Sequence, residues 1–184
     1  MGEEKKQIGM VTDFFSKPLR LNIIGGYTGS GKTDIIRHLG KNNHQIIDLE
    51  KIACHKGSSF GGLGQEVQPT TEQFENNLFR AFLDLDLSKP VWIEDESHNI
   101  GGVNIPMPLF NTMNRSKLFF LEIPAKLRAE HIVQEYAGYD PHLIGEAINR
   151  ISKRLGGENS GKAHEYLAQR DFFNLALLIL KYYD

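Results

Sequence analysis

The feature that most constrains the fold is a glycine-rich loop between two apolar segments, in the stretch LNIIGGYTGSGKTDII of residues 21–36. The apolar run before the loop predicts a buried strand, and the run after it has helical spacing. Within the loop, Gly26, Gly31, Lys32 and Thr33 match the pattern G-x-x-x-x-G-K-[ST], which binds phosphate where it joins a strand to a helix. The sequence therefore predicts a phosphate-binding loop.

The residue types in this loop suit phosphate chemistry. Glycines let backbone N–H groups converge on phosphate oxygens, and the start of the following helix adds partial positive charge. Lys32 supplies a full positive charge, and the Thr33 hydroxyl is placed to bind Mg²⁺. The competing interpretation is a glycine-rich turn with a solvated lysine. The predicted phosphate-binding residues are Gly26, Gly29, Ser30, Gly31, Lys32 and Thr33.

Strand-like and helix-like segments alternate along the rest of the chain. This alternation predicts an α/β fold, a three-layer P-loop NTPase-like domain with a mostly parallel sheet. The expected strands lie within residues 20–26, 44–50, 90–97 and 117–123, and the expected helices within residues 32–40, 70–86, 125–138, 140–157 and 170–184. Thr70 or Thr71 is the expected N-cap of the second helix, whose Phe74, Leu78, Phe79 and Phe82 share one face.

Length and composition indicate one soluble domain. A chain of 184 residues is long enough for one core, and we expect a polar N-terminal segment over 1–13 and a P-loop domain over 14–184. The net charge of -2 does not mark a generally basic nucleic-acid binder. No apolar run is long enough to span a membrane, so we expect a cytoplasmic protein. The single cysteine, Cys54, cannot form an internal disulfide and is expected to be structural rather than nucleophilic.

Three consecutive carboxylates follow the apolar residues VWI, where a P-loop protein needs a metal-holding acid. We predict that Asp95 holds Mg²⁺ together with Thr33 and acts with Lys32 in catalysis. Successive side chains of a strand point to opposite faces, so Glu94 and Glu96 are expected to point away from Asp95. An ordinary charged strand end is the competing interpretation.

A second glycine-rich segment, HKGSSFGGLG of residues 55–64, combines four glycines with His55, Lys56, Ser58 and Ser59. Such a loop is suited to close over an anion, or it is a surface loop without a ligand. Four phenylalanines elsewhere are expected to fill the core, because aromatic runs usually do so. They are Phe119, Phe120, Phe172 and Phe173.

Several segments together resemble the P-loop domain of bacterial tRNA 2-selenouridine synthases over about residues 14–184. They are GGYTGSGKT, IDLEKIACHKGSSFGGLG, QPTTEQFE, WIEDESHNIG and KRLGG. The resemblance implies an enzyme that replaces the sulfur of wobble 2-thiouridine with selenium from selenophosphate, through an S-geranylated intermediate made with geranyl diphosphate. Relatives usually add an N-terminal rhodanese-like domain, so tRNA and a separate rhodanese-like chain or domain are the implied partners.

The phosphate ligand stays open at this point, because a P-loop recognises phosphoryl oxygens in geranyl diphosphate, selenophosphate or ATP alike. Arg150 and Arg154 lie one helical turn apart and, with Arg128, are candidates to contact the ligand or tRNA phosphates; a solvated helix face is the competing interpretation. Glu96 and the four polar residues of the second loop are further candidates. Two other functions remain: an ATP-dependent small-molecule kinase or NTPase, and a non-catalytic tRNA-binding module.

Overall fold

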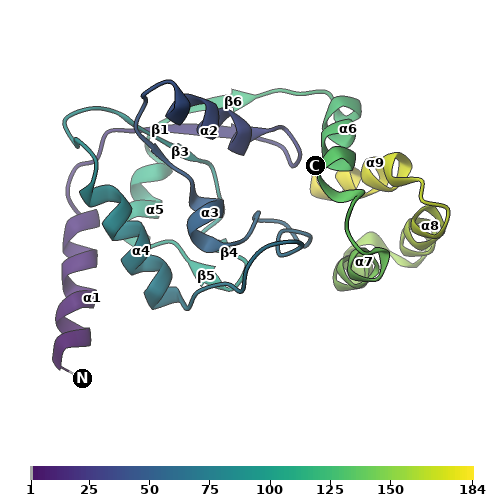
Figure 1. The fold of residues 1–184 in the computed structure, drawn as a ribbon, viewed down its shortest axis with the longest axis horizontal. Helices are drawn as coiled ribbons and strands as arrows, with labels where there is room; N and C mark the ends of the chain where they lie inside the picture. Colours follow the sequence, from purple (N-terminus) through teal and green to yellow (C-terminus); the bar gives the residue numbers. More distant parts are fainter. Residues whose placement is uncertain (1) are drawn as a thin grey trace.

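The computed structural model of the chain describes residues 2–184, with side chains described from residue 9 onward (Figure 1). Helices and strands are interspersed up to residue 121, and helices alone follow. The elements are α1 (Gly2–Phe15), β1 (Leu21–Gly26), α2 (Lys32–Lys41), β2 (Ile46–Ile47), α3 (Leu49–Ala53), α4 (Thr71–Leu83), β3 (Val91–Glu94), β4 (Asn99–Ile100), β5 (Val103–Asn104), α5 (Met107–Met113), β6 (Lys117–Leu121), α6 (Ala125–Tyr136), α7 (Pro141–Leu155), α8 (Gly157–Ala168) and α9 (Phe172–Tyr183).

The central sheet has four strands in the order β2-β3-β1-β6, and all three neighbouring pairs are parallel. Ile23 of β1 lies opposite Ile93 of β3 on one side and Leu118 of β6 on the other. The short strands β4 and β5 form a separate antiparallel pair. The expected parallel α/β sheet is therefore confirmed.

Helices cover both faces of this sheet. One core contains Ile23 and Ile93 of the strands together with buried residues of α1, α4 and α5. Helix α2 packs on β1 and β3 without joining that core, and its Ile36 is fully buried. Thr70 caps α4 by accepting a hydrogen bond from the Gln73 N–H at 3.2 Å, as its sequence predicts.

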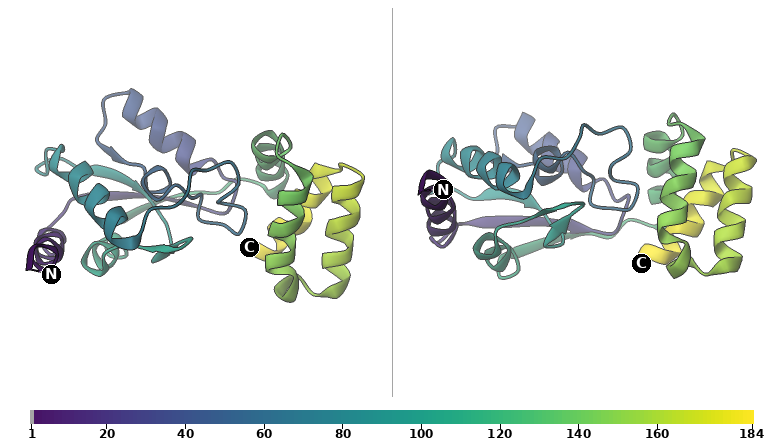
Figure 2. Two further views of the ribbon diagram at one scale, coloured as in Figure 1. Left: turned by 60° about the horizontal axis from the view of Figure 1, so that its bottom comes forward. Right: turned by 90° about the horizontal axis from the view of Figure 1, so that it is seen from below.

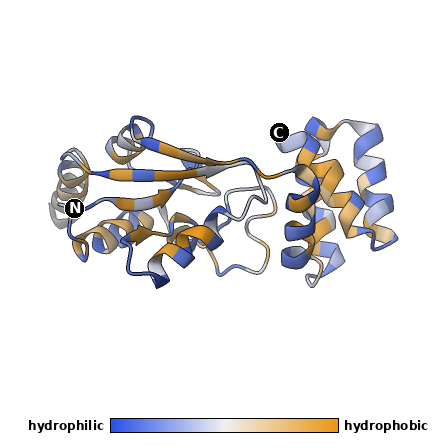
Figure 3. Cartoon of the chain, turned by 90° about the horizontal axis from the view of Figure 1, so that it is seen from above, coloured by the Kyte–Doolittle hydropathy of each residue, from blue (hydrophilic) through white to orange (hydrophobic). Residues whose placement is uncertain are grey.

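The C-terminal part of the chain forms a second lobe, which we call the helical lobe and which comprises α6 to α9. It lies beside the carboxyl ends of the parallel strands (Figures 1 and 2) and has its own buried residues. Apolar residues gather along the facing sides of these helices (Figure 3). The sequence did not predict α8 as a helix. No helix among residues 2–184 is long and apolar enough to cross a membrane.

The segment 1–13 was expected to be a polar extension, and α1 covers most of it. Met1 lies outside the described residues. Val11 and Phe15 are buried, and the Phe15 ring meets the Phe82 ring of α4 at a centroid distance of 5.2 Å. The predicted boundary after residue 13 therefore falls inside a helix that packs on the core.

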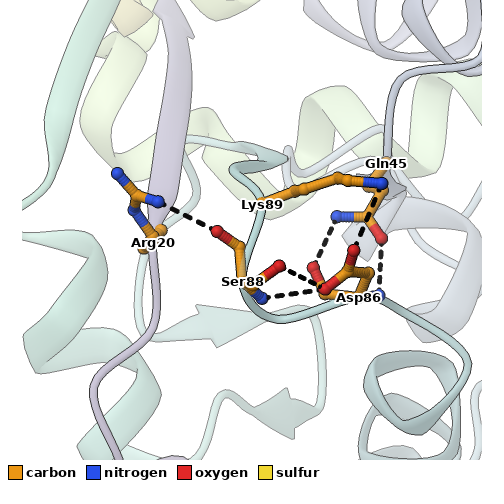
Figure 4. A network of polar contacts seen from close by, with 5 residues as sticks. All are labelled: Arg20, Gln45, Asp86, Ser88 and Lys89. Atoms are coloured by element: carbon orange, nitrogen blue, oxygen red, sulfur yellow. Dashed lines mark hydrogen bonds and ion pairs between the residues drawn. The ribbon is translucent and has the colours of Figure 1, made fainter.

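A polar network holds the loop that precedes β3 (Figure 4). Arg20, just before β1, donates to the Ser88 carbonyl at 2.9 Å. Gln45, just before β2, donates to the Asp86 carbonyl at 3.0 Å and accepts from the Asp86 N–H at 2.6 Å. The Lys89 ammonium pairs with the Asp86 carboxylate at 3.2 Å. These contacts tie together the starts of three strands at the end of the sheet opposite the phosphate-binding loop.

Candidate active site

The predicted phosphate-binding loop, residues 26–33, follows β1 at the carboxyl edge of the sheet, where parallel α/β folds bind their ligands. Gly29 and Gly31 have φ angles of 76° and 77°, which residues other than glycine adopt only with strain. The Lys32 ammonium donates to the Gly26 carbonyl at 2.9 Å. The buried Ser30 hydroxyl has no hydrogen-bond partner in the described part of the chain. The loop thus combines a lysine and a buried hydroxyl at the start of α2.

A cavity of about 410 Å³ opens between this loop and the helical lobe. One part of its wall is polar and includes Lys32, Thr33, Glu50, Lys56, Asp95 and Glu96. The other part is mostly apolar and comes from the helical lobe and the second glycine-rich loop. Its residues include Phe60, Ile132, Tyr136, Ile144, Leu175, Ile179 and Leu180. The cavity is therefore suited to a ligand with a charged head and an apolar body.

Two glutamates lie next to Thr33, the residue expected to bind the metal. The Thr33 hydroxyl donates to the Glu50 carboxylate at 2.8 Å, and the Glu50 N–H lies 3.3 Å from a Glu94 carboxylate oxygen. Glu94 is fully buried, and its Oε1 has no partner among the described residues. Sequence reasoning missed Glu50 altogether, although its place directly after the second strand is the available signal.

Burial and mutual repulsion shift these carboxyl groups toward the protonated form. Burial, together with the charges of Glu50 and Asp48, raises the pKa of Glu94 to about 8. Burial and Glu50 raise the pKa of Glu96 to about 7. Burial also raises the pKa of Glu50 itself. Glu94 therefore holds a proton near neutral pH, and Glu96 is partly protonated there.

Glu96 was expected to point away from Asp95, but both line the cavity, whereas the buried Glu94 does not. Asp95 directly follows β3. It is exposed and lines the cavity, and its carboxylate lies near Gly25. Burial raises its pKa, whereas the charge of Lys32 opposes that shift. Among residues 2–184, no group of three or more His, Cys, Asp or Glu side chains is arranged to hold a metal ion by itself. The assignment of Asp95 to a metal stays a prediction, and Glu50 and Glu94 are the acids beside Thr33.

The second glycine-rich loop docks on the helical lobe and closes one side of the cavity. The Lys56 ammonium pairs with the Glu135 carboxylate at 2.5 Å and lies 5.2 Å from the centre of the Tyr136 ring. The Ser59 N–H donates to the Tyr183 hydroxyl at 3.0 Å. Of the four candidates in this loop, Lys56 and Ser58 line the cavity. His55 instead accepts a bond from the Gly57 N–H within the loop.

The predicted arginines have structural partners. Arg128 is 3% exposed, donates to the Thr28 carbonyl of the phosphate-binding loop at 3.1 Å, and pairs with the Asp184 carboxylate. Arg150 donates to the Ser59 carbonyl at 3.0 Å. Arg154 donates to the Tyr182 hydroxyl at 3.1 Å. Of these three, Arg128 directly contacts the phosphate-binding loop.

His131 and Cys54 have contacts that bear on the site. His131 of α6 lines the cavity and its Nε2 lies 2.9 Å from the Asp34 carboxylate, a pairing between lobes that no sequence spacing indicates. Cys54 has a φ of 50° and caps the end of α3, and its thiol is 3.7 Å from the Lys51 carbonyl.

The strand order, the loop after β1 and the acid at the end of β3 define a P-loop α/β domain. A family model described as "tRNA 2-selenouridine synthase AAA domain" matches residues 19–142, which is more than half of the chain. The chain belongs to this family.

The most informative relatives carry the name tRNA 2-selenouridine synthase. A protein of Nitrosomonas europaea is 38% identical over 138 residues, which cover 73% of this chain and 35% of the relative. Those of Shewanella sediminis and Hydrogenovibrio crunogenus are each 32% identical, covering 95% and 93% of this chain and 54% and 53% of the relatives. The chain thus spans about a third to a half of these relatives. No solved structure matches it.

Proposed function

We propose that this chain is the P-loop component of a tRNA 2-selenouridine synthase and binds geranyl diphosphate for transfer to the sulfur of a wobble 2-thiouridine. The observation that carries the proposal is the two-part cavity, in which Lys32 and the phosphate-binding loop adjoin an apolar wall. Selenophosphate has no apolar body to bury there. Each buried methylene of a prenyl chain contributes about 0.8 kcal/mol, so the apolar wall favours the geranyl compound.

The proposed chemistry is an alkyl transfer. The thiouridine sulfur attacks C1 of the geranyl group, the C1–O bond breaks, and the diphosphate leaves with the electron pair. The base releases its N3 proton to solvent, so that the S-alkylated base is neutral. Lys32 and the loop N–H groups stabilise the negative charge that grows on the leaving diphosphate. The apolar wall excludes water, which would otherwise compete with sulfur for the geranyl carbon.

The carboxylates of the cavity suit a bound Mg²⁺. Glu50, which lines the cavity, and the buried Glu94 lie beside Thr33 and are the candidates to hold it directly or through water; Asp95 also lines the cavity. The buried Glu94 oxygen without a partner supports this fit, because a cation would satisfy it. Mg²⁺ supplies positive charge to the diphosphate when it is bound.

The test is a melting-temperature measurement with Mg²⁺ and one added ligand: geranyl diphosphate, dimethylallyl diphosphate, inorganic diphosphate, selenophosphate or ATP. At about 100 times its Kd, a ligand stabilises the protein by about 2.7 kcal/mol, which is a shift of several degrees. Lys32→Ala should abolish the shift. Lys51 is an exposed lysine outside the cavity, so the control variant Lys51→Ala should retain the shift.

We expect geranyl diphosphate to stabilise the protein more than dimethylallyl diphosphate or inorganic diphosphate, because only the longer chain reaches the apolar wall. Leu175→Gln places an amide in that wall and should narrow the difference between the two prenyl compounds. Equal stabilisation by all diphosphates would contradict a geranyl site.

Two other functions have their own signatures. A kinase or NTPase predicts selective stabilisation by ATP and phosphate release or transfer that Lys32→Ala abolishes. A non-catalytic tRNA-binding module predicts that charge reversal at Arg150 and Arg154 weakens RNA binding and flattens its salt dependence. Both arginines already bond to Ser59 and Tyr182, so a charge reversal needs a folding control.

A further inference from the structure

Three large apolar side chains next to the phosphate-binding loop are about half exposed. Tyr27, Leu118 and Phe120 have exposed fractions of 45%, 51% and 48%. The Tyr27 and Phe120 rings lie 5.2 Å apart with planes at 90°. Phe120 was expected in the core, and that prediction is wrong. We call these three side chains, together with Asp95, the aromatic lip.

The exposure of Phe120 follows from the position of β6. Gly25 and Phe120 lie opposite each other in the sheet, on the same face as Ile23 and Ile93. Those two isoleucines are buried under helices. Strand β6 is the edge of the sheet, and its residues are exposed or only half-buried. Burial in the core therefore does not account for an aromatic residue at this position.

The aromatic lip adjoins the cavity. Tyr27 and Asp95 both line the cavity wall. The backbone of Gly25 brings the other members together: a Cβ at this residue would lie 2.7 Å from Leu118, 3.3 Å from Phe120 and 3.4 Å from the Asp95 carboxylate. Gly25 thus leaves room for an apolar surface with one carboxylate beside the cavity.

We propose that the aromatic lip is the place where an unpaired nucleobase of the RNA substrate stacks beside the cavity. This inference rests on the proposed function, because it gives the cavity an RNA substrate. A base reaches an enclosed cavity only when it leaves its helical stack, and proteins hold unstacked RNA bases on exposed aromatic rings. The Asp95 carboxylate is an acceptor for a base N–H.

The size and chemistry of the aromatic lip favour a base over a protein partner. A stable protein interface buries about 800 Å² on each side, which three apolar side chains do not provide. The Arg128 guanidinium lies 5.1 Å from the centre of the Tyr27 ring and is itself buried, so it supports the ring from one side. A planar base is the partner that two perpendicular rings and one carboxylate fit.

The test measures binding of a stem-loop RNA with an unpaired uridine-containing loop, and of the matched fully paired duplex, by fluorescence anisotropy. Phe120→Ala and Phe120→Leu should weaken stem-loop binding about 5- to 150-fold, the factor equivalent to one lost base–aromatic stack. Phe120→Trp should retain binding, because it keeps an aromatic surface. Leu83→Ala removes an exposed apolar side chain from α4, away from the aromatic lip, and serves as the control.

Binding by Phe120→Leu at the wild-type level would overturn the proposal, because it would show that hydrophobicity alone suffices. An equal loss for the duplex, or no measurable binding of the stem-loop by the wild type, would also overturn it. Geranyl diphosphate separates this inference from the proposed function. Its thermal shift should persist in Phe120→Ala, and a wild-type protein that binds RNA through Phe120 without such a shift would refute only the geranyl proposal.

Discussion

The contact between the phosphate-binding loop and the helical lobe can be measured with two glycine substitutions. Gly29 and Gly31 have nearly the same φ, 76° and 77°, so alanine at either position adopts the left-handed conformation at a cost of about 1–2 kcal/mol. Their surroundings differ. A Cβ at Gly29 would lie 2.8 Å from the Ile132 side chain and 3.0 Å from the Arg128 carbonyl of α6, whereas a Cβ at Gly31 would meet only Asp34 at 4.0 Å.

Gly29→Ala therefore adds overpacking to the backbone strain, and overpacking typically costs about 1–3 kcal/mol. We expect Gly31→Ala to lower the free energy of unfolding by about 1–2 kcal/mol and Gly29→Ala by about 2–5 kcal/mol. Urea denaturation without added phosphate ligands measures both values under the same conditions. Equal losses for the two variants would refute the packing of α6 on the loop.

Three further predictions concern stability. With divalent cations chelated, the free energy of unfolding should fall as pH rises from about 4.5 to about 8. The reason is that folded Glu94 holds its proton up to a pKa of about 8, whereas the unfolded chain releases it near 4.5. Urea denaturation across that range measures the dependence, and Glu94→Gln should remove at most about 5 kcal/mol of it. Thr70→Ala should lower the free energy of unfolding by about 1 kcal/mol through loss of the α4 cap. In the same assay, Thr70→Ser should retain most of the stabilisation that the cap provides. Phe74→Ala should cost about 3–5 kcal/mol because its ring is fully buried, and a loss below about 1 kcal/mol would contradict that burial.

Sequence patterns predicted the elements whose backbone conformation depends mainly on residues close in sequence. The loop from Gly26 to Thr33 lies between a strand and a helix as its spacing predicts, since glycine conformations and helix starts are local properties. The shared face of Phe74, Leu78 and Phe82 on α4 was predicted as well, because helical spacing alone places these residues on one side of the helix. Helix α8 was missed because its sequence is polar and rich in glycine, and only packing against α7 and α9 orders it.

The site itself depends on contacts between distant segments. Asp95 was predicted as the metal-holding acid because a P-loop needs a carboxylate at the end of a neighbouring strand, and that assignment stays a prediction. The contact between Thr33 and Glu50 brings a further carboxylate to the loop across 17 residues. The pairing of His131 with Asp34 spans 97 residues, and no periodicity encodes it.

The sequence by itself determined that this chain carries a P-loop between a strand and a helix of a parallel sheet, because backbone conformation and strand–helix alternation depend on local residue types. Only the tertiary structure decided what surrounds that loop. The helical lobe provides an apolar wall to the cavity, and the edge position of β6 leaves Phe120 exposed. Both depend on which segments meet in space, because burial is a property of the folded arrangement rather than of a residue.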